Sequence, residues 1–173
     1  VAKAAGTVWD GDRVVVARDT RTTGEMLVNT AVSGLQSVGV DVDRLGPTPT
    51  PAAVRYAGKN GRPGIVITAS HNPPEYNGVK LVGSDGVELA VDDLERIENH
   101  ILGEEFATAS WDGVGTTTRV DAANREYVAD LLASVDREAI AAADLTVALD
   151  PGHGAGALTS PEFFRELGCD VVT

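Results

Sequence analysis

The sequence is poor in features that would each indicate a particular class of protein. Its one cysteine, Cys169, has no partner within the chain, which excludes an internal disulfide framework. No apolar run reaches the roughly 18 residues that a membrane-spanning helix needs. Residues 1–9 also lack the apolar stretch of a secretory signal. We therefore expect a cytoplasmic protein without a membrane partner. Because the first residue is valine, we expect the natural start to lie upstream.

Lysine is also scarce, and acidic residues dominate. The chain has 26 acidic residues against 14 basic ones, a formal net charge of −12, and its lysines are Lys3, Lys59 and Lys80. A surface of this sign repels nucleic acid and anionic membranes, so neither is expected as a partner. The composition is typical of a halophilic-like acidic surface, on which high salt screens the self-repulsion. An ordinary acidic protein is the alternative.

Strands and helices alternate along the chain. Apolar runs predict strands at 13–17, 40–45, 64–69, 79–82, 87–89, 145–149 and 170–173. Helices are predicted from Thr22 to Gly39, after the proline-rich segment 46–51, around 94–103, from Asp121 and from Ser160. Thr22 and Glu25 have the spacing of a capping box, and Ser160-Pro161 is typical of a helix start. Residues 104–120 are polar, and no element is predicted there.

This alternation predicts an α/β protein with three layers, α/β/α. The strand at 145–149 begins a second series of strand, loop, helix and strand. We place a first domain at residues 1–143 and the opening βαβ of a truncated second domain at 144–173. Because one βαβ unit cannot cover both faces of its strands, we expect that Thr173 is not a natural terminus.

Residues 68–80, TASHNPPEYNGVK, form the segment whose residues are best suited to catalysis. A buried strand delivers Ser70 to its carboxyl end, where open α/β sheets place their ligands. Two prolines and an Asn-Gly pair make the following loop stiff, which suits a hydroxyl that must meet a phosphorus atom in line. His71 can donate a hydrogen bond beside a phosphate, and Lys80 supplies a mobile charge that can exchange a proton. Asn72, Asn77 and Gly78 are expected to shape the loop.

This segment resembles the phosphoserine loop of the α-D-phosphohexomutases, the family of phosphoglucomutase, phosphomannomutase and phosphoglucosamine mutase. Residues 14–21 resemble the second strand and turn of that family's first domain, and residues 46–51 its Thr-Pro segment. Residues 147–156 resemble the first strand and loop of its second domain. The resemblance spans nearly all of the chain. It implies a first domain with a mixed, mostly parallel sheet, whose N-terminal strand is missing from these residues.

The resemblance implies reversible transfer of phosphate between the 1- and 6-positions of a hexose. Phosphorylated Ser70 would donate to a free hydroxyl of the hexose phosphate, and the bisphosphorylated sugar would reorient and return its other phosphate. Lys80 would bind substrate and act as general acid and base, and His71 would support the phosphoserine. Mg²⁺ would bind the Ser70 phosphate together with carboxylates, offsetting its charge.

Several parts of the family's site are absent from the 173 residues. These are the D-G-D-G-D-R metal loop, the sugar-selecting loop, the loop that grips the distal phosphate and an Arg-Gly segment near the N-terminus. We therefore expect that missing domains of the same protein complete the site, and that the chain alone is inactive.

Two local patterns allow more than one interpretation. Arg18, Asp19 and Arg21 form either an ion-paired turn, which we favour, or a contact to the substrate phosphate, for which Arg18 is the candidate. Residues 150–156 follow a strand and are rich in glycine, but they fit neither dinucleotide-loop nor P-loop spacing, so a plain turn is favoured. His100 and His153 have no ligand partners at metal spacing and are treated as structural.

Two functions from other classes remain as alternatives. A serine hydrolase would need a G-x-S-x-G elbow around Ser70, and Asn72 stands at its second glycine position. A module that binds sugar phosphates or a protein partner without catalysis is the other alternative.

Overall fold

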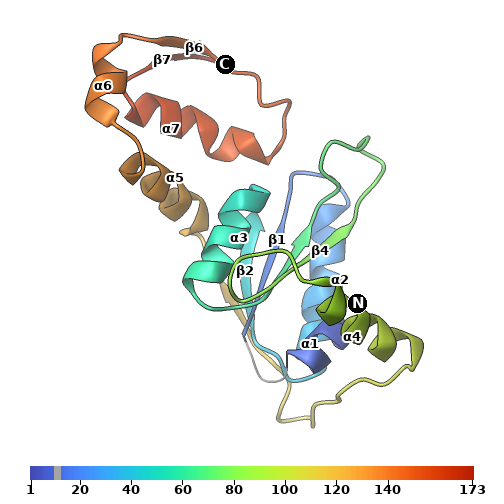
Figure 1. Ribbon diagram of the computed structural model, residues 1–173. Helices are drawn as coiled ribbons and strands as arrows, with labels where there is room; N and C mark the ends of the chain where they lie inside the picture. The colour runs from blue at the N-terminus through green and yellow to red at the C-terminus, as the bar shows by residue number, and fades with distance from the viewer. Residues whose placement is uncertain (10–12) are drawn as a thin grey trace.

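The computed structural model describes residues 1–9 and 13–173. Its centre is a five-stranded sheet in the order β4-β3-β1-β2-β5 (Figure 1). The strands are β1 (Val14–Arg18), β2 (Val42–Pro47), β3 (Gly64–Ile67), β4 (Val79–Val82) and β5 (Thr117–Arg119). Strand β1 pairs in parallel with β2 and β3, and β2 in parallel with β5, whereas β4 runs antiparallel to β3. The predicted mixed, mostly parallel sheet is confirmed.

Helices cover both faces of this sheet, which confirms the predicted three layers (Figure 1). Helices α1 (Ala2–Val8), α2 (Gly24–Gln36) and α4 (Val91–Leu102) lie on one face, and α3 (Thr50–Lys59) and α5 (Ala123–Ala133) on the other. Val14 and Val16 belong to the first core, whereas Val15 and Ala17 belong to the second. Strand β1 is therefore apolar at successive positions because both of its faces are buried.

The register of β1 and β3 brings two loops to the same edge of the sheet. Arg18 at the end of β1 lies opposite Ile67 at the end of β3. Because the strands are parallel, the residues that follow them leave the sheet side by side. Strand β4 then returns along β3, and the N–H of Thr68 donates to the carbonyl of Gly78 at 3.1 Å. This bond closes the base of the loop that carries Ser70.

A second, smaller unit follows the first sheet and is orange to red in Figure 1. Helix α6 (Arg137–Ala142) leads from α5 to the parallel strands β6 (Thr146–Ala148) and β7 (Asp170–Val172). The 3₁₀ helix η1 (Ala155–Leu158) and helix α7 (Ser160–Glu166) connect the two strands, and Cys169 is buried beside β7. The incomplete second α/β unit is thus present. The proposed domain boundary at 143/144 falls between α6 and β6.

The predicted capping box of Thr22 and Glu25 is wrong. Thr23 is the residue that precedes α2, and it makes no side-chain cap bond. The carboxylate of Glu25 instead contacts Arg18 at 3.1 Å and also Arg44, because the neighbouring strands β1 and β2 bring two guanidinium groups to it. Helix α7 begins at Ser160 with Pro161 in its first turn, which confirms the predicted helix start, although the residue that precedes it is Thr159 and makes no side-chain cap bond.

Other boundaries also differ from the sequence-based expectation. Residues 87–89 form a single bridge, between Val82 and Glu88, instead of a strand. Strand β5 lies in the segment for which no element was predicted, and its three residues are exposed. Helices α1 and α6 were not predicted either. Among the described residues, no helix is long and apolar enough to cross a membrane.

Candidate active site

Ser70 follows the buried strand β3 and stands exposed at the edge of the sheet. Its backbone has a φ of +51°, in the left-handed region that non-glycine residues seldom adopt. Its Oγ lies 3.3 Å from Nδ1 of His71, within hydrogen-bond distance. The structure therefore brings together two of the residues that the sequence predicts for catalysis, on a turn that presents the hydroxyl to solvent.

The Ser70 loop is bound by an arginine from the neighbouring turn. Arg21 lies in the turn after β1, and its Nη1 donates to the carbonyls of Pro73 and Tyr76 at 2.7 and 3.0 Å. Its Nη2 donates to the carbonyls of Ser70 and Asn72 at 2.9 and 2.7 Å. The favoured interpretation of residues 18–21 anticipated an ion-paired turn, and Arg21 does pair with Asp19 at 3.0 Å. The contacts to the loop were not anticipated.

Ser70 and His71 line a cavity of about 600 Å³. Its wall is formed by residues of four segments, within 19–22, 49–51, 68–74 and 152–156. The last segment belongs to the second unit, and the hydroxyl of Thr20 donates to the carbonyl of His153 at 2.9 Å. Gly152 and His153 have φ values of +58° and +59°, so the segment turns sharply there. Its spacing fits no nucleotide motif, and nothing in the sequence indicated that it would face Ser70.

Lys80 and Arg18 lie outside the lining of this cavity. The Nζ of Lys80 on β4 pairs with the Glu88 carboxylate at 3.3 Å. The Nε of Arg18 pairs with Glu25, and its Nη1 donates to the carbonyl of Asp19 at 2.9 Å. The roles assigned to Lys80 and Arg18 from sequence stay predictions.

The shared carboxylate of Glu25 is held in its charged form. Desolvation by burial acts to raise the pKa of Glu25, but the hydrogen bonds and positive charges of Arg44 and Arg18 outweigh it and lower that pKa. The three side chains therefore form a charged cluster beside the end of β1 and the middle of β2, in which the Glu25 carboxylate neutralises part of the positive charge of both arginines.

The described residues do not form a cage for Mg²⁺. No group of three or more His, Cys, Asp or Glu side chains among them is arranged to hold a metal ion. Near Ser70, the Asp19 carboxylate already accepts hydrogen bonds from Arg21 and from the hydroxyl of Thr68.

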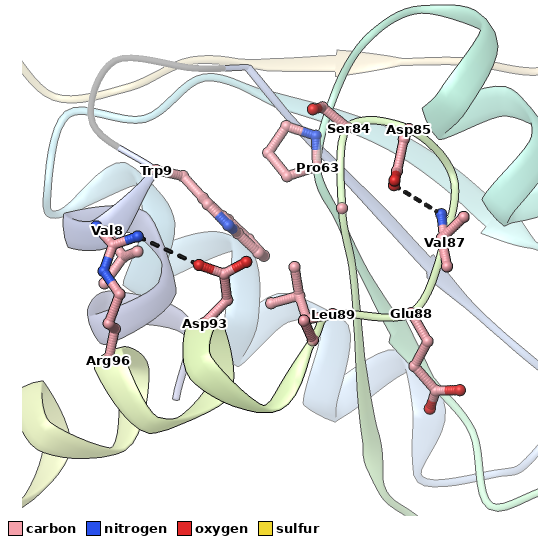
Figure 2. A pocket seen from close by; sticks show the side chains of 12 residues that line it. Val8, Trp9, Pro63, Ser84, Asp85, Val87, Glu88, Leu89, Asp93 and Arg96 are labelled. Atoms are coloured by element: carbon pink, nitrogen blue, oxygen red, sulfur yellow. Dashed lines mark hydrogen bonds and ion pairs between the residues drawn. The ribbon is translucent and has the colours of Figure 1, made fainter.

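A second hollow of about 390 Å³ lies between α1, α4 and the turn after β4 (Figure 2). The side chain of Trp9 points into it, and Arg96 pairs with Asp93 at 3.2 Å on its wall. Its lining contains none of the predicted site residues. The candidate active site is the cavity that Ser70 and His71 line together.

Comparison with known proteins shows the family of this chain. The family described as "Phosphoglucomutase/phosphomannomutase, alpha/beta/alpha domain I" matches residues 1–108. The chain belongs to this family. The phosphohexomutase resemblance of the Ser70 loop is thereby confirmed.

The relatives of this phosphohexomutase chain include archaeal and bacterial proteins. It is 41% identical to the phosphoglucosamine/phosphogalactosamine mutase of Sulfurisphaera tokodaii, a match that covers 100% of this chain and 39% of the relative. It is 44% identical to the phosphoglucomutase/phosphomannomutase of Thermococcus kodakarensis, covering 92% of this chain and 35% of the relative. A crystal structure of a family protein from Burkholderia thailandensis superposes with a TM-score of 0.81 at 32% identity, covering 99% of this chain and 38% of that one. The chain thus spans about two fifths of the length of these relatives.

Proposed function

We propose that this chain is the phosphoryl-carrying part of a phosphohexomutase, which interconverts hexose 1-phosphate and hexose 6-phosphate. The observation that carries the proposal is the exposed Ser70, presented with a φ of +51° at the edge of the sheet and beside His71 in a cavity. This arrangement lies in a domain of the phosphoglucomutase/phosphomannomutase family. The relatives are named as mutases of different sugars, so the proposal specifies hexose phosphates as a class.

In the proposed reaction, the phosphate of Ser70 passes to the free hydroxyl of a hexose phosphate. The bond between Ser70 Oγ and phosphorus breaks and Oγ takes up a proton, while a bond between the sugar oxygen and phosphorus forms and the sugar hydroxyl gives its proton to a base. The bisphosphorylated sugar then reorients, and Ser70 takes its other phosphate. Because the transferred group carries nearly two negative charges, holding and neutralising it supplies most of the catalysis.

His71 and Lys80 have distinct proposed roles. His71, with Nδ1 at 3.3 Å from Ser70 Oγ, can donate to the phosphate when that nitrogen is protonated. Lys80 is the proposed acid and base toward the sugar hydroxyl, and its pair with Glu88 must open before it can act. A Mg²⁺ ion would offset charge on the Ser70 phosphate, with its remaining ligands supplied from outside this chain.

We further propose that the groups that bind the sugar and its distal phosphate belong to further domains of the same protein. The proposed location of that protein is the cytoplasm. The chain on its own is then inactive. The cavity supports this proposal, because its wall combines one edge of the sheet with a single loop of the second unit.

The decisive experiment follows the phosphoryl group on Ser70. A protein that contains this chain and the proposed further domains is incubated with a hexose 1,6-bisphosphate, and the intact mass and the phosphorylated peptide are determined. We expect a gain of one phosphoryl group on Ser70, none in Ser70→Ala, and an unchanged gain in Ser84→Ala, which removes a hydroxyl from another loop. Absence of phosphate from Ser70 in the wild type would falsify the proposal. Labelling of Ser70 by a fluorophosphonate would favour a serine hydrolase, and sugar-phosphate binding without transfer would favour a binding module.

A further inference from the structure

All five N–H donors of the Arg21 guanidinium are used within the structure. The Nε donates to the carboxylate of Asp19 at 3.0 Å. The two terminal nitrogens donate to four backbone carbonyls, those of Ser70, Asn72, Pro73 and Tyr76. A guanidinium has five such donors, so none remains for a phosphate. Arg21 therefore acts on the Ser70 loop and does not contact substrate.

The four carbonyls belong to one exposed loop, residues 70–76. Residues 70–76 are all exposed, so burial of side chains contributes little to its shape. The backbone of the loop adds hydrogen bonds from Asn72 to Ala69 at 3.0 Å and from Tyr76 to Pro73 at 3.1 Å. Since one planar group collects carbonyls from both ends of the loop, it sets their relative positions. The direction of the Ser70 backbone thus depends on Arg21.

Arg21 is itself anchored from the sheet side. Its own N–H donates to Oδ1 of Asp19 at 2.9 Å, while Oδ2 of Asp19 accepts from Nε of Arg21 and from the hydroxyl of Thr68 at 2.9 Å. The side chains of Arg21 and Asp19 are 11% and 17% exposed. Asp19 and Thr68 follow the ends of β1 and β3, so the anchor reaches back to the rigid sheet. Hydrogen bonds between charged groups in such a partly buried setting are stronger than neutral ones.

We propose that Arg21 is the positioning residue for phosphoryl transfer at Ser70. This inference rests on the proposed function. Arg21 holds the Ser70 carbonyl and so maintains the left-handed backbone that aims Oγ into the cavity. Lysine cannot replace it, because an ammonium is a compact charge with three donors and cannot serve four carbonyls and Asp19 together.

The test compares Arg21→Lys and Arg21→Gln with the wild type in a protein that contains this chain and the proposed further domains. Arg96→Lys is the matched control, because Arg96 is 64% exposed and lies on the wall of the other hollow. We expect the single-turnover rate of phosphoryl transfer from Ser70 to hexose phosphate to fall about 100-fold in both Arg21 variants, as misplaced reacting groups do. The dissociation constant for hexose phosphate should stay near the wild-type value. Free guanidinium should restore part of the rate in Arg21→Ala.

Amide hydrogen exchange in the same proteins provides a readout that does not depend on transfer. Exchange in residues 69–78 should accelerate in the Arg21 variants, while exchange in β1 and β3 stays slow. If Arg21→Gln unfolds, Asp19→Asn is the milder variant, since it removes the charged partner of Arg21 and Asp19 bonds to Arg21 and Thr68 rather than to residues 70–76. The same direction is expected.

The possible failures are distinguishable. Transfer at the wild-type rate in Arg21→Lys would overturn the inference and leave the proposed function standing. A wild type that never carries phosphate on Ser70 would overturn the proposed function. Even without phosphate on Ser70, unchanged amide exchange of residues 69–78 in Arg21→Gln would refute the claim that Arg21 orders the loop.

Discussion

Replacing Gly115 with alanine tests a close crossing of two backbone segments. A Cβ built at Gly115 meets the carbonyl oxygen of Val40 first, lies 2.5 Å from that carbonyl carbon, and lies 3.1 Å from the nitrogen of Asp41. Real Cβ atoms essentially never approach another atom closer than 3.0 Å. Because the obstructing atoms are backbone at the start of β2, no side-chain rotation relieves the contact, and the two segments must separate.

The separation has a cost that can be estimated from the bonds near the crossing. The N–H of Gly115 donates to Gln36 at 3.1 Å, and the N–H of Val42 donates to Thr116 at 2.8 Å, which begins the pairing of β2 with β5. Overpacking of this kind costs about 1–3 kcal/mol, and the rigid backbone places Gly115→Ala at the upper end, about 3 kcal/mol. For a chain of this length, each kcal/mol lowers the melting temperature by about 2–4 °C, so we expect a decrease of about 6–12 °C.

Thermal unfolding followed by circular dichroism measures this effect, with Gly64→Ala as the control. A Cβ at Gly64 meets its nearest atom, the carbonyl oxygen of Val15, at 3.5 Å, an ordinary contact. Alanine also reduces the freedom of the unfolded chain, so Gly64→Ala should melt at or slightly above the wild-type temperature. An unchanged melting temperature for Gly115→Ala, or an equal decrease in both variants, would refute the reasoning.

Two further predictions concern carboxylates at the amino end of β2. Asp43 is 2% exposed and accepts hydrogen bonds from Arg13 and Arg62. Asp43→Ala should therefore lower the free energy of unfolding, measured in urea, by about 3 kcal/mol. A change no larger than that caused by substituting an exposed residue would contradict this prediction. The backbone N–H and the hydroxyl of Thr116, together with the charge of Arg13, lower the pKa of Asp41. Because the pKa of Asp41 is lower in the folded than in the unfolded chain, Asp41 stabilises the fold at a pH above the unfolded pKa of about 3.9. This stabilisation is lost as the pH falls through the folded pKa. Asp41→Asn should therefore lose less stability than the wild type between neutral pH and about pH 3 in urea titrations; parallel curves would count against it.

The sheet could be predicted because its central strands carry their own pattern. Val14 to Ala17 and Gly64 to Ile67 are apolar without a break, and only strands covered on both faces can bury such runs. The position of Ser70 follows directly from the second of these strands. Strand β5 could not be predicted, because its residues are exposed and it is defined by parallel pairing with β2, over 70 residues earlier in the chain.

The contacts of charged side chains were the least predictable part of the site. Glu25 has the spacing of a capping residue, yet its carboxylate forms ion pairs with Arg18 and Arg44. Arg21 binds carbonyl groups about 50 residues away. Every residue has a carbonyl, so no residue type marks such partners in a sequence. The capping motif failed for the same reason, since a local pattern cannot include competitors that tertiary structure brings near.

Cys169 gives the chain a built-in chemical probe of its second unit. It is the only thiol in the sequence and is 8% exposed beside β7, whereas Trp9 packs against the core of the first unit. Modification of the thiol by a colorimetric reagent therefore follows opening around β6 and β7. The change in tryptophan emission follows loosening around α1, because the other tryptophan, Trp111, is already 91% exposed. Comparing the two time courses in denaturant would reveal whether the units open together or separately, without introducing any label.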